Sequence, residues 1–169
     1  MDSNKEQFSL IYDQYIEKIY RFVYLKVSSQ EIAEDITSKV FLNGWESYQR
    51  QPEKIQNTGA FLYQIARNMV VDHYRDKGRT KTVSVDRVSQ ITDTRTNLHE
   101  KAIVNSDIEL VKSAIQNLKK DYQDVLIWHY LEDMPVEQIS KIIDKPAGTI
   151  RVMLHRGLSA LRNELREEA

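Results

Sequence analysis

The sequence contains no cysteine, and only five glycines and three prolines among its 169 residues. Without cysteine, the chain can build neither a disulfide framework nor a thiolate metal site. Few glycines and prolines also mean few of the tight turns that join short strands. Long segments with apolar residues at helical spacing lie between these breakers, so we expect an all-α fold.

Long hydrophobic runs are absent as well. No stretch approaches the roughly 18 apolar residues of a membrane-spanning helix. The first residues, MDSNKEQFSL, have neither a basic start nor an apolar run of signal length. We therefore expect a soluble, cytoplasmic protein with no direct membrane insertion. Hydrophobic residues form 41% of the chain, which is enough for the cores of one or two small domains.

The net charge is only −1, so the molecule as a whole does not attract nucleic acid. The charges are unevenly distributed, however. Residues 67–87 contain six Lys/Arg against three Asp, and residues 141–162 contain five Lys/Arg against one Asp. Acidic residues elsewhere balance these segments: Glu31, Glu34, Asp35, Asp121, Asp124, Glu132 and Asp133. Two basic faces in a neutral chain indicate two weak nucleic-acid contacts that need additional binding energy.

The first two predicted helices span residues 5–27 and 30–47, and Ser28 or Ser29 can cap the second. One face of the second helix carries its core residues, Ile32, Ala33, Ile36, Val40 and Gly44. Phe41, Leu42 and Trp45 fall largely outside that face, beside acidic residues. A large apolar group in this position favours a protein-docking surface, although another helix of the same domain could cover it.

A third helix is predicted over residues 61–79, FLYQIARNMVVDHYRDKGR, after a polar loop at 48–60 and with Gly78 as its C-terminal cap. Its apolar arc consists of Phe61, Leu62, Ile65, Ala66, Met69 and Val70. The opposite arc consists of Gln64, Arg67, Asn68, Tyr74 and Arg75, with Val71 among them. Planar, forked and aromatic side chains suit bases and phosphates, whereas the alternative is an ordinary solvated helix face.

Residues 80–106 are rich in Thr, Ser and Asp and have no sustained apolar period. We interpret them as a flexible tether between a domain of residues 1–79 and a second domain of residues 107–169. Four helices are predicted in the second domain, over residues 107–118, 119–133, 135–144 and 148–169. We therefore expect two small helical domains joined by a linker.

The last two predicted helices and the DKPA turn between them have the pattern of a helix-turn-helix. The inward arc of the last helix consists of Ile150, Leu154, Leu158, Leu161 and Leu165, and the outward arc of Arg151, Val152, His155, Ser159 and Arg162. In this motif the second helix enters the major groove of DNA. Arg151 and Arg156 can make forked contacts to guanine or phosphate, and His155 can donate to either. Thr149 and the amides at the helix start suit a phosphate.

The order EIAEDITSKVFLNGW, FLYQIARNMVVDHYR, a polar tether and VLIWHYLEDMPVEQISKIIDKPAGTIRVMLHRGLSALR resembles bacterial sigma factors. The similarity is to the small extracytoplasmic-function type, which keeps only regions two and four. It implies a transcription initiation subunit, with no enzymatic activity, metal or cofactor. The implied partners are core RNA polymerase, promoter DNA as duplex and as melted non-template strand, and an anti-sigma factor.

The resemblance assigns functional residues to three surfaces. The segment that grips polymerase corresponds to Asp35, Phe41, Leu42 and Trp45. The reader of the −10 element combines the matched positions with the polar arc: Asn57, Gln64, Arg67, Asn68, Asp72, Tyr74, Arg75 and Arg79. The −35 recognition helix corresponds to Gly148, Thr149, Arg151, Val152, His155 and Arg156.

Three alternatives remain beside this interpretation. A self-sufficient helix-turn-helix regulator would bind its site without polymerase, and a helical adaptor would use only the Phe41–Trp45 patch. An enzyme could pair Asp72 with His73, or His129 with Asp133. Adjacent residues on a helix diverge by about 100°, which disfavours the first of these catalytic pairs.

Overall fold

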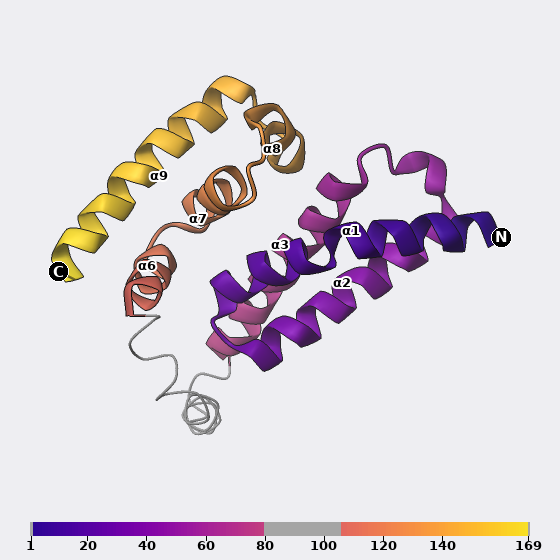
Figure 1. Ribbon diagram of the computed structural model, residues 1–169, viewed down its shortest axis with the longest axis horizontal. Helices are drawn as coiled ribbons and strands as arrows, with labels where there is room; N and C mark the ends of the chain where they lie inside the picture. Colours follow the sequence, from indigo (N-terminus) through magenta and orange to yellow (C-terminus); the bar gives the residue numbers. More distant parts are fainter. Residues whose placement is uncertain (1, 80–105, 169) are drawn as a thin grey trace.

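The computed structural model describes the backbone of residues 2–79 and 106–168, and the elements in these ranges are helices (Figure 1). The N-terminal bundle consists of α1 (Asp2–Val27), α2 (Gln30–Arg50) and α3 (Thr58–Arg79). The C-terminal bundle consists of α6 (Ser106–Gln116), α7 (Lys120–Leu126), α8 (Val136–Ile143) and α9 (Ala147–Glu168). The predicted all-α fold is confirmed. The expected tether at 80–106 lies outside the described residues, except for Ser106.

The turn between α1 and α2 has the predicted cap. Ser28 adopts a left-handed conformation with φ of 59°, which ends α1. The Ser29 side chain then accepts a hydrogen bond from the Ile32 amide at 3.3 Å, satisfying one of the free N–H groups at the start of α2.

The loop predicted at residues 48–60 is shorter than expected. Helix α2 continues to Arg50, a 3₁₀ turn, η1, covers Pro52–Lys54, and α3 already begins at Thr58. One residue of this polar segment packs in the core: Tyr48 is buried, and its ring lies 5.6 Å from that of Phe8. Packing of one aromatic residue therefore extends α2 by a further turn.

Phe41 and Trp45 do not form the open apolar surface that was predicted. Phe41 is buried, with its ring 4.9 Å from that of Tyr12, and the ring of Trp45 lies 5.3 Å from that of Phe8. The long helix α1 covers a wider arc of α2 than one apolar stripe. Leu42 is the member of this trio that stays exposed, at 57%.

Two further helix boundaries differ from the prediction. Helix α3 runs through Gly78 to Arg79, so Gly78 is not its cap. The helix predicted at 119–133 consists of α7 followed by a π-helical turn, η2, at Ile127–Leu131. Asp133, with φ of 53°, then reverses the chain toward α8.

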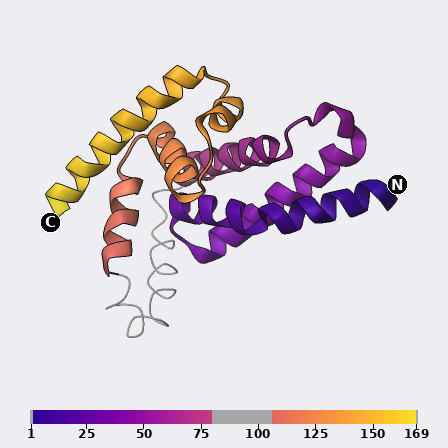
Figure 2. The ribbon, with the colours of Figure 1, turned by 45° about the horizontal axis from the view of Figure 1, so that its top comes forward.

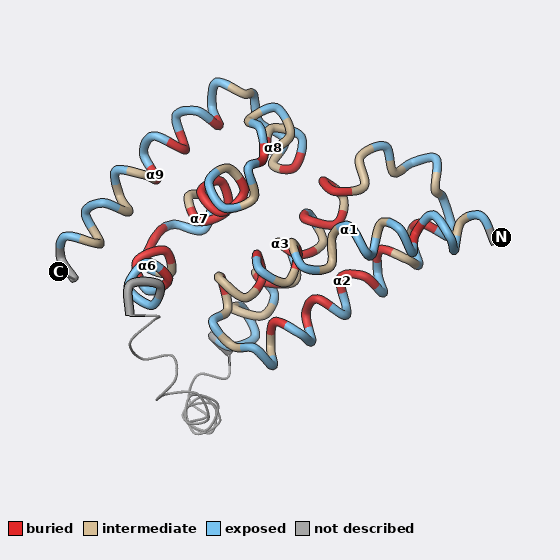
Figure 3. The backbone as a smooth tube through the Cα atoms, viewed as in Figure 1, coloured by how far each residue is buried: buried red, intermediate tan, exposed pale blue. Residues whose placement is uncertain are grey.

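The helix-turn-helix pattern appears as α8, a turn at Asp144 with φ of 62°, and α9, which also packs on α6 and α7 (Figure 2). The inward arc of α9 is confirmed, because Ile150 and Leu154 are buried and Leu158, Leu161 and Leu165 are half-buried. The outward residues are exposed, and burial alternates along α9 accordingly (Figure 3).

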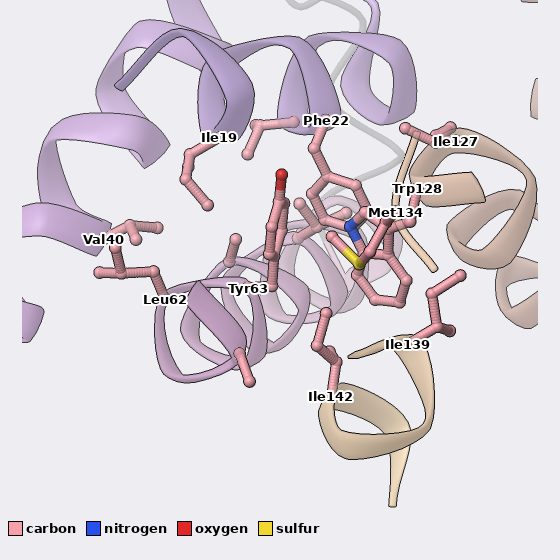
Figure 4. Close-up of a cluster of buried hydrophobic side chains, with 14 of the residues drawn as sticks. Ile19, Phe22, Val40, Leu62, Tyr63, Ile127, Trp128, Met134, Ile139 and Ile142 are labelled. Atoms are coloured by element: carbon pink, nitrogen blue, oxygen red, sulfur yellow. The ribbon is translucent and has the colours of Figure 1, made fainter. Parts of the chain in front are cut away.

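The two bundles pack against each other through a shared apolar cluster. Figure 4 shows Phe22 of α1 and Tyr63 of α3 beside Trp128, with Met134 and Ile142 nearby. The Trp128 ring is stacked on Phe22 at 5.1 Å and meets Tyr63 edge-on at 5.4 Å. Trp128 is fully buried. Residues of both bundles therefore form one contiguous core.

Candidate nucleic-acid interface

The first half of α9 presents the predicted −35 residues to solvent. Gly148, Thr149, Arg151, Val152, His155 and Arg156 are all exposed. Arg151 is the one with a charged neighbour on α8, since its Nη2 lies 3.7 Å from Glu137 Oε1 across two well-exposed side chains. Exposed ion pairs of this kind are weak and exchange readily. Arg151 can therefore leave this partner for a base edge or a phosphate.

A hollow of about 360 Å³ extends this face beyond α9, and it adds two cations, Lys119 and Lys120, that the sequence interpretation had missed. Lys119 and Lys120 reach it from the start of α7, and Lys145 from the turn before α9, while Thr149 lines it from α9 itself. The signal that could have revealed Lys119 and Lys120 is that they form a Lys-Lys pair at the start of α7. Asp121 also lines the hollow, but three lysines around one concave surface beside the predicted −35 helix favour contacts to a phosphate backbone.

The predicted −10 residues on α3 divide into two groups. Asn68, Asp72 and Arg75 are exposed, and the Arg75 guanidinium lies 3.7 Å from the Asp72 carboxylate. Asn57 has a structural part as well, because its Oδ1 accepts the Ala60 amide at 2.9 Å at the start of α3. The side chain of Arg79 is outside the part of the chain whose side chains the structure describes.

The second group, Gln64, Arg67 and Tyr74, contacts other parts of the protein. Arg67 Nε donates to Asp124 at 2.8 Å, and its Nη2 donates to Asp121 at 3.3 Å. Gln64 Nε2 donates to the Ile142 carbonyl at 3.0 Å.

Tyr74 is held from two sides. Its hydroxyl donates to the Lys26 carbonyl, and the Lys120 ammonium lies 4.9 Å from the centre of its ring. The C-terminal bundle thus contacts three of the predicted −10 residues, of which Gln64 stays exposed and Arg67 and Tyr74 are half-buried.

A buried ion pair lies behind this contact. Lys26 of α1 and Asp124 of α7 are both nearly inaccessible, and the Lys26 ammonium donates to Asp124. Burial lowers the pKa of Lys26, while the negative charge of Asp124 opposes that shift. The pair joins residues 98 positions apart, so the sequence did not reveal it. The available signal was a lysine within the apolar segment that ends α1.

The predicted polymerase-binding residues lie on α2. Leu42 is exposed, and the exposed Asp35 carboxylate lies 3.1 Å from the Lys39 ammonium one turn later. Phe41 and Trp45 pack beneath them against α1, so they support this surface from inside. An exposed leucine beside mixed charges suits a protein contact with an apolar centre and a polar rim.

Two other kinds of feature are absent from the part of the chain that the structure describes. It contains no group of three or more His, Asp or Glu side chains arranged to hold a metal ion. Nor is any helix there long and apolar enough to cross a membrane.

Comparison with known proteins finds a family match for each of the two bundles. Residues 11–80 match the family described as Sigma-70 region 2, and residues 108–161 match Sigma-70, region 4. The two matches together cover most of the chain in the order that its motifs predicted. The chain therefore belongs to the sigma-70 family.

Its similar relatives are extracytoplasmic-function (ECF) sigma factors. Over 97% of this chain it is 27% identical to SigW of Bacillus subtilis and 24% identical to BldN of Streptomyces coelicolor. It spans 91% of the length of SigW and 62% of that of BldN. The sigma factor RpoE from Bartonella quintana, solved in complex with the anti-sigma factor NepR, shares the fold. That match has a TM-score of 0.71, 21% identity and coverage of 95% of this chain and 98% of that chain.

Gly148 allows a test of the recognition helix that separates stability from DNA binding. A Cβ at this position would meet no heavy atom within 4 Å, so Gly148→Ala is expected to raise stability by up to about 1 kcal/mol through helix propensity. In the predicted −35 complex, the same methyl group would stand between the start of α9 and the DNA backbone. We expect a higher Tm but weaker −35-dependent transcription. A variant that gains both stability and activity would remove Gly148 from the DNA contact.

Proposed function

We propose that this protein is an alternative sigma factor that binds core RNA polymerase, recognises −10 and −35 promoter DNA and assists promoter opening. The observation that supports this most directly is the exposed cationic face of α9 within a helix-turn-helix, on a chain that matches both sigma regions. Relatives of this kind are initiation factors, and we accordingly propose a non-enzymatic, cytoplasmic protein. RpoE was solved with NepR, so an anti-sigma factor is a further proposed partner.

In this proposal the three surfaces have separate tasks. Asp35 and Leu42 on α2 contact polymerase, with Phe41 and Trp45 holding that surface in shape. The −10 element meets Asn57 and the polar arc of α3, and the −35 element meets α9. Two weak DNA contacts become one strong contact when polymerase holds them at a fixed separation, because the second then forms at high effective concentration.

Promoter opening follows from the chemistry of the polar arc. Amide, guanidinium and phenol groups such as Gln64, Arg67 and Tyr74 can stack on or hydrogen-bond to unpaired bases. Capture of unstacked bases of the non-template strand offsets the free energy of unpairing, so the melted state becomes populated. The protein needs no catalytic group for this step.

Transcription in vitro tests the proposal. Core polymerase, genomic DNA fragments and the purified protein are expected to give initiation at discrete sites that core polymerase alone does not use. The free protein should bind duplex DNA only in the non-specific range, at about 10⁻⁴–10⁻⁶ M at physiological salt. Absence of any dependent initiation would contradict the proposal. Nanomolar, site-specific binding by the protein alone would indicate a self-sufficient regulator instead.

A further inference from the structure

We propose that Val152 reads a thymine in the −35 element, by packing its isopropyl group against the 5-methyl group of that base in the major groove. This proposal rests on the proposed function, because it takes α9 as the −35 recognition helix. It adds the identity of a base that this helix selects and the group on that base that the protein contacts.

Val152 lies at the centre of the outward arc of α9. Helices α6, α7 and α8 pack on the other side of α9, where Ile150 and Leu154 are buried (Figure 1). At about 100° per residue, Val152 points about 160° away from each of these two core residues. It is the sixth residue of a helix that begins at Ala147, within the half that a helix-turn-helix places nearest the base edges. Val152 therefore points directly away from the core, where the bases would lie.

Val152 is an exposed apolar residue on a helix face that is otherwise polar. It is 47% exposed, and it is the one exposed large hydrophobic residue of α9 among the side chains that the structure describes. The next residue, Met153, is also apolar, but it is only 8% exposed and packs in the core. Single exposed apolar residues are common on protein surfaces, so exposure alone does not indicate a ligand. The residues that surround Val152 supply that indication.

The neighbours of Val152 on the helix surface are groups suited to DNA. Gly148 and Thr149 lie one turn before it, and His155 and Arg156 lie one turn after it, at the spacings that bring helix residues side by side. All four are exposed. When these residues contact bases or phosphates, Val152 is enclosed between them and loses its contact with water. Its isopropyl group then meets a base edge.

Thymine carries the feature of the major groove that suits an isopropyl group. Guanine, adenine and cytosine present hydrogen-bond donors or acceptors there, whereas thymine adds a methyl group at C5. An isopropyl group placed against a donor or acceptor would displace water without replacing its hydrogen bond, which costs free energy. Against the thymine methyl group, the same isopropyl group buries apolar surface instead. Val152 therefore selects thymine over the other three bases.

Selection from random DNA tests which base is read. Holoenzyme, assembled from core polymerase and the full chain, selects from a library of duplexes randomised over the length of a promoter. The natural protein should enrich a −35 element with thymine at one base pair. Val152→Ser, which replaces the apolar group by a hydroxyl, should lose the preference at that base pair and keep the preferences at the others. Val111→Ser is the matched control, because Val111 is a 40% exposed valine on α6, and it should keep every preference.

Removal of the thymine methyl group alone is the sharper test. Deoxyuridine presents the same hydrogen-bonding groups as thymidine but lacks the 5-methyl group, so it replaces the thymines of the enriched duplex one at a time. Holoenzyme with the natural protein should bind about three- to fivefold more weakly when the selected thymine is replaced. Val152→Ala removes both γ methyl groups and should bind the two duplexes equally. Because Val152 is exposed and alanine favours a helix, this variant should unfold at or above the natural Tm.

The outcomes separate this proposal from the proposed function. Equal binding of the thymine and uracil duplexes by the natural protein, at every thymine, would overturn the reading of a methyl group. A thymine preference that survives in Val152→Ser would belong to another residue and would overturn the proposal as well. In both cases, sequence-specific recognition by the holoenzyme remains intact. Selection that enriches no −35 sequence would instead contradict the proposed function, and this proposal with it.

Discussion

Replacing Arg151 and Arg156 together by alanine is expected to lower promoter-dependent transcription by about 30-fold or more. Both side chains are exposed on the first half of α9, where a helix-turn-helix places its base-reading residues. Each forked arginine contact contributes about 1–3 kcal/mol, and each 1.4 kcal/mol corresponds to a tenfold change in binding. Because the holoenzyme loses both contacts, transcription should fall at promoters that need the −35 element.

The measurement is transcription in vitro beside co-purification with core polymerase. Binding to polymerase should survive, because the proposed polymerase surface lies on α2. Arg166→Ala, in the last turn of the same helix, is the matched control, since it removes an exposed arginine far from the reading half. Loss of polymerase binding in the double variant would show that α9 has a different task from the one proposed.

The face of α9 could be predicted from the sequence because its pattern is local. A helix with one apolar stripe must bury that stripe, so the residues on the other side are exposed whatever the partner is. Ile150 and Leu154 inside and Arg151 and His155 outside follow from this argument alone. The Ser29 cap is local in the same sense, because it needs only the amide of Ile32.

The face of α2 was predicted less well because it has more than one neighbour. A helical wheel assigns one buried arc, but α1 and α3 both pack on α2, so Phe41 and Trp45 are covered as well. Gly44 shows the same crowding, since a Cβ there would come within 2.9 Å of Leu62 on α3. The width of the buried arc depends on tertiary packing, and the spacing of apolar residues in the sequence does not show how many helices pack on α2.

The contact between the bundles was beyond sequence reasoning for a different reason. Its members are pairs such as Lys26 with Asp124 and Arg21 with Glu132, which lie 98 and 111 positions apart. The sequence did show that acidic residues of the second half balance the basic segments. The structure adds that Asp121 and Asp124 lie directly against Arg67 of the first basic segment. Acidic and basic residues that balance in the net charge of the chain therefore also form ion pairs at this contact.

Leu42→Arg is expected to weaken binding to core polymerase by about 10- to 100-fold without destabilising the protein. Leu42 is 57% exposed on α2, so a charged side chain there meets water in the free protein. Surface substitutions of this kind usually change the free energy of unfolding by less than about 0.5 kcal/mol. In a complex, the same charge would lie at the apolar centre of the contact, where single residues can contribute about 2 kcal/mol or more.

Leu10→Arg is the matched control for this prediction, because Leu10 is 69% exposed on α1 and outside the proposed polymerase surface. Both variants should show the thermal unfolding transition of the natural protein, and only Leu42→Arg should fail to co-purify with polymerase. Transcription should then fall with it, although binding of the free protein to single-stranded DNA stays the same. If Leu10→Arg were the variant that lost polymerase instead, the docking surface would lie on the outer face of α1. Asp35 and Leu42 would then have no part in it.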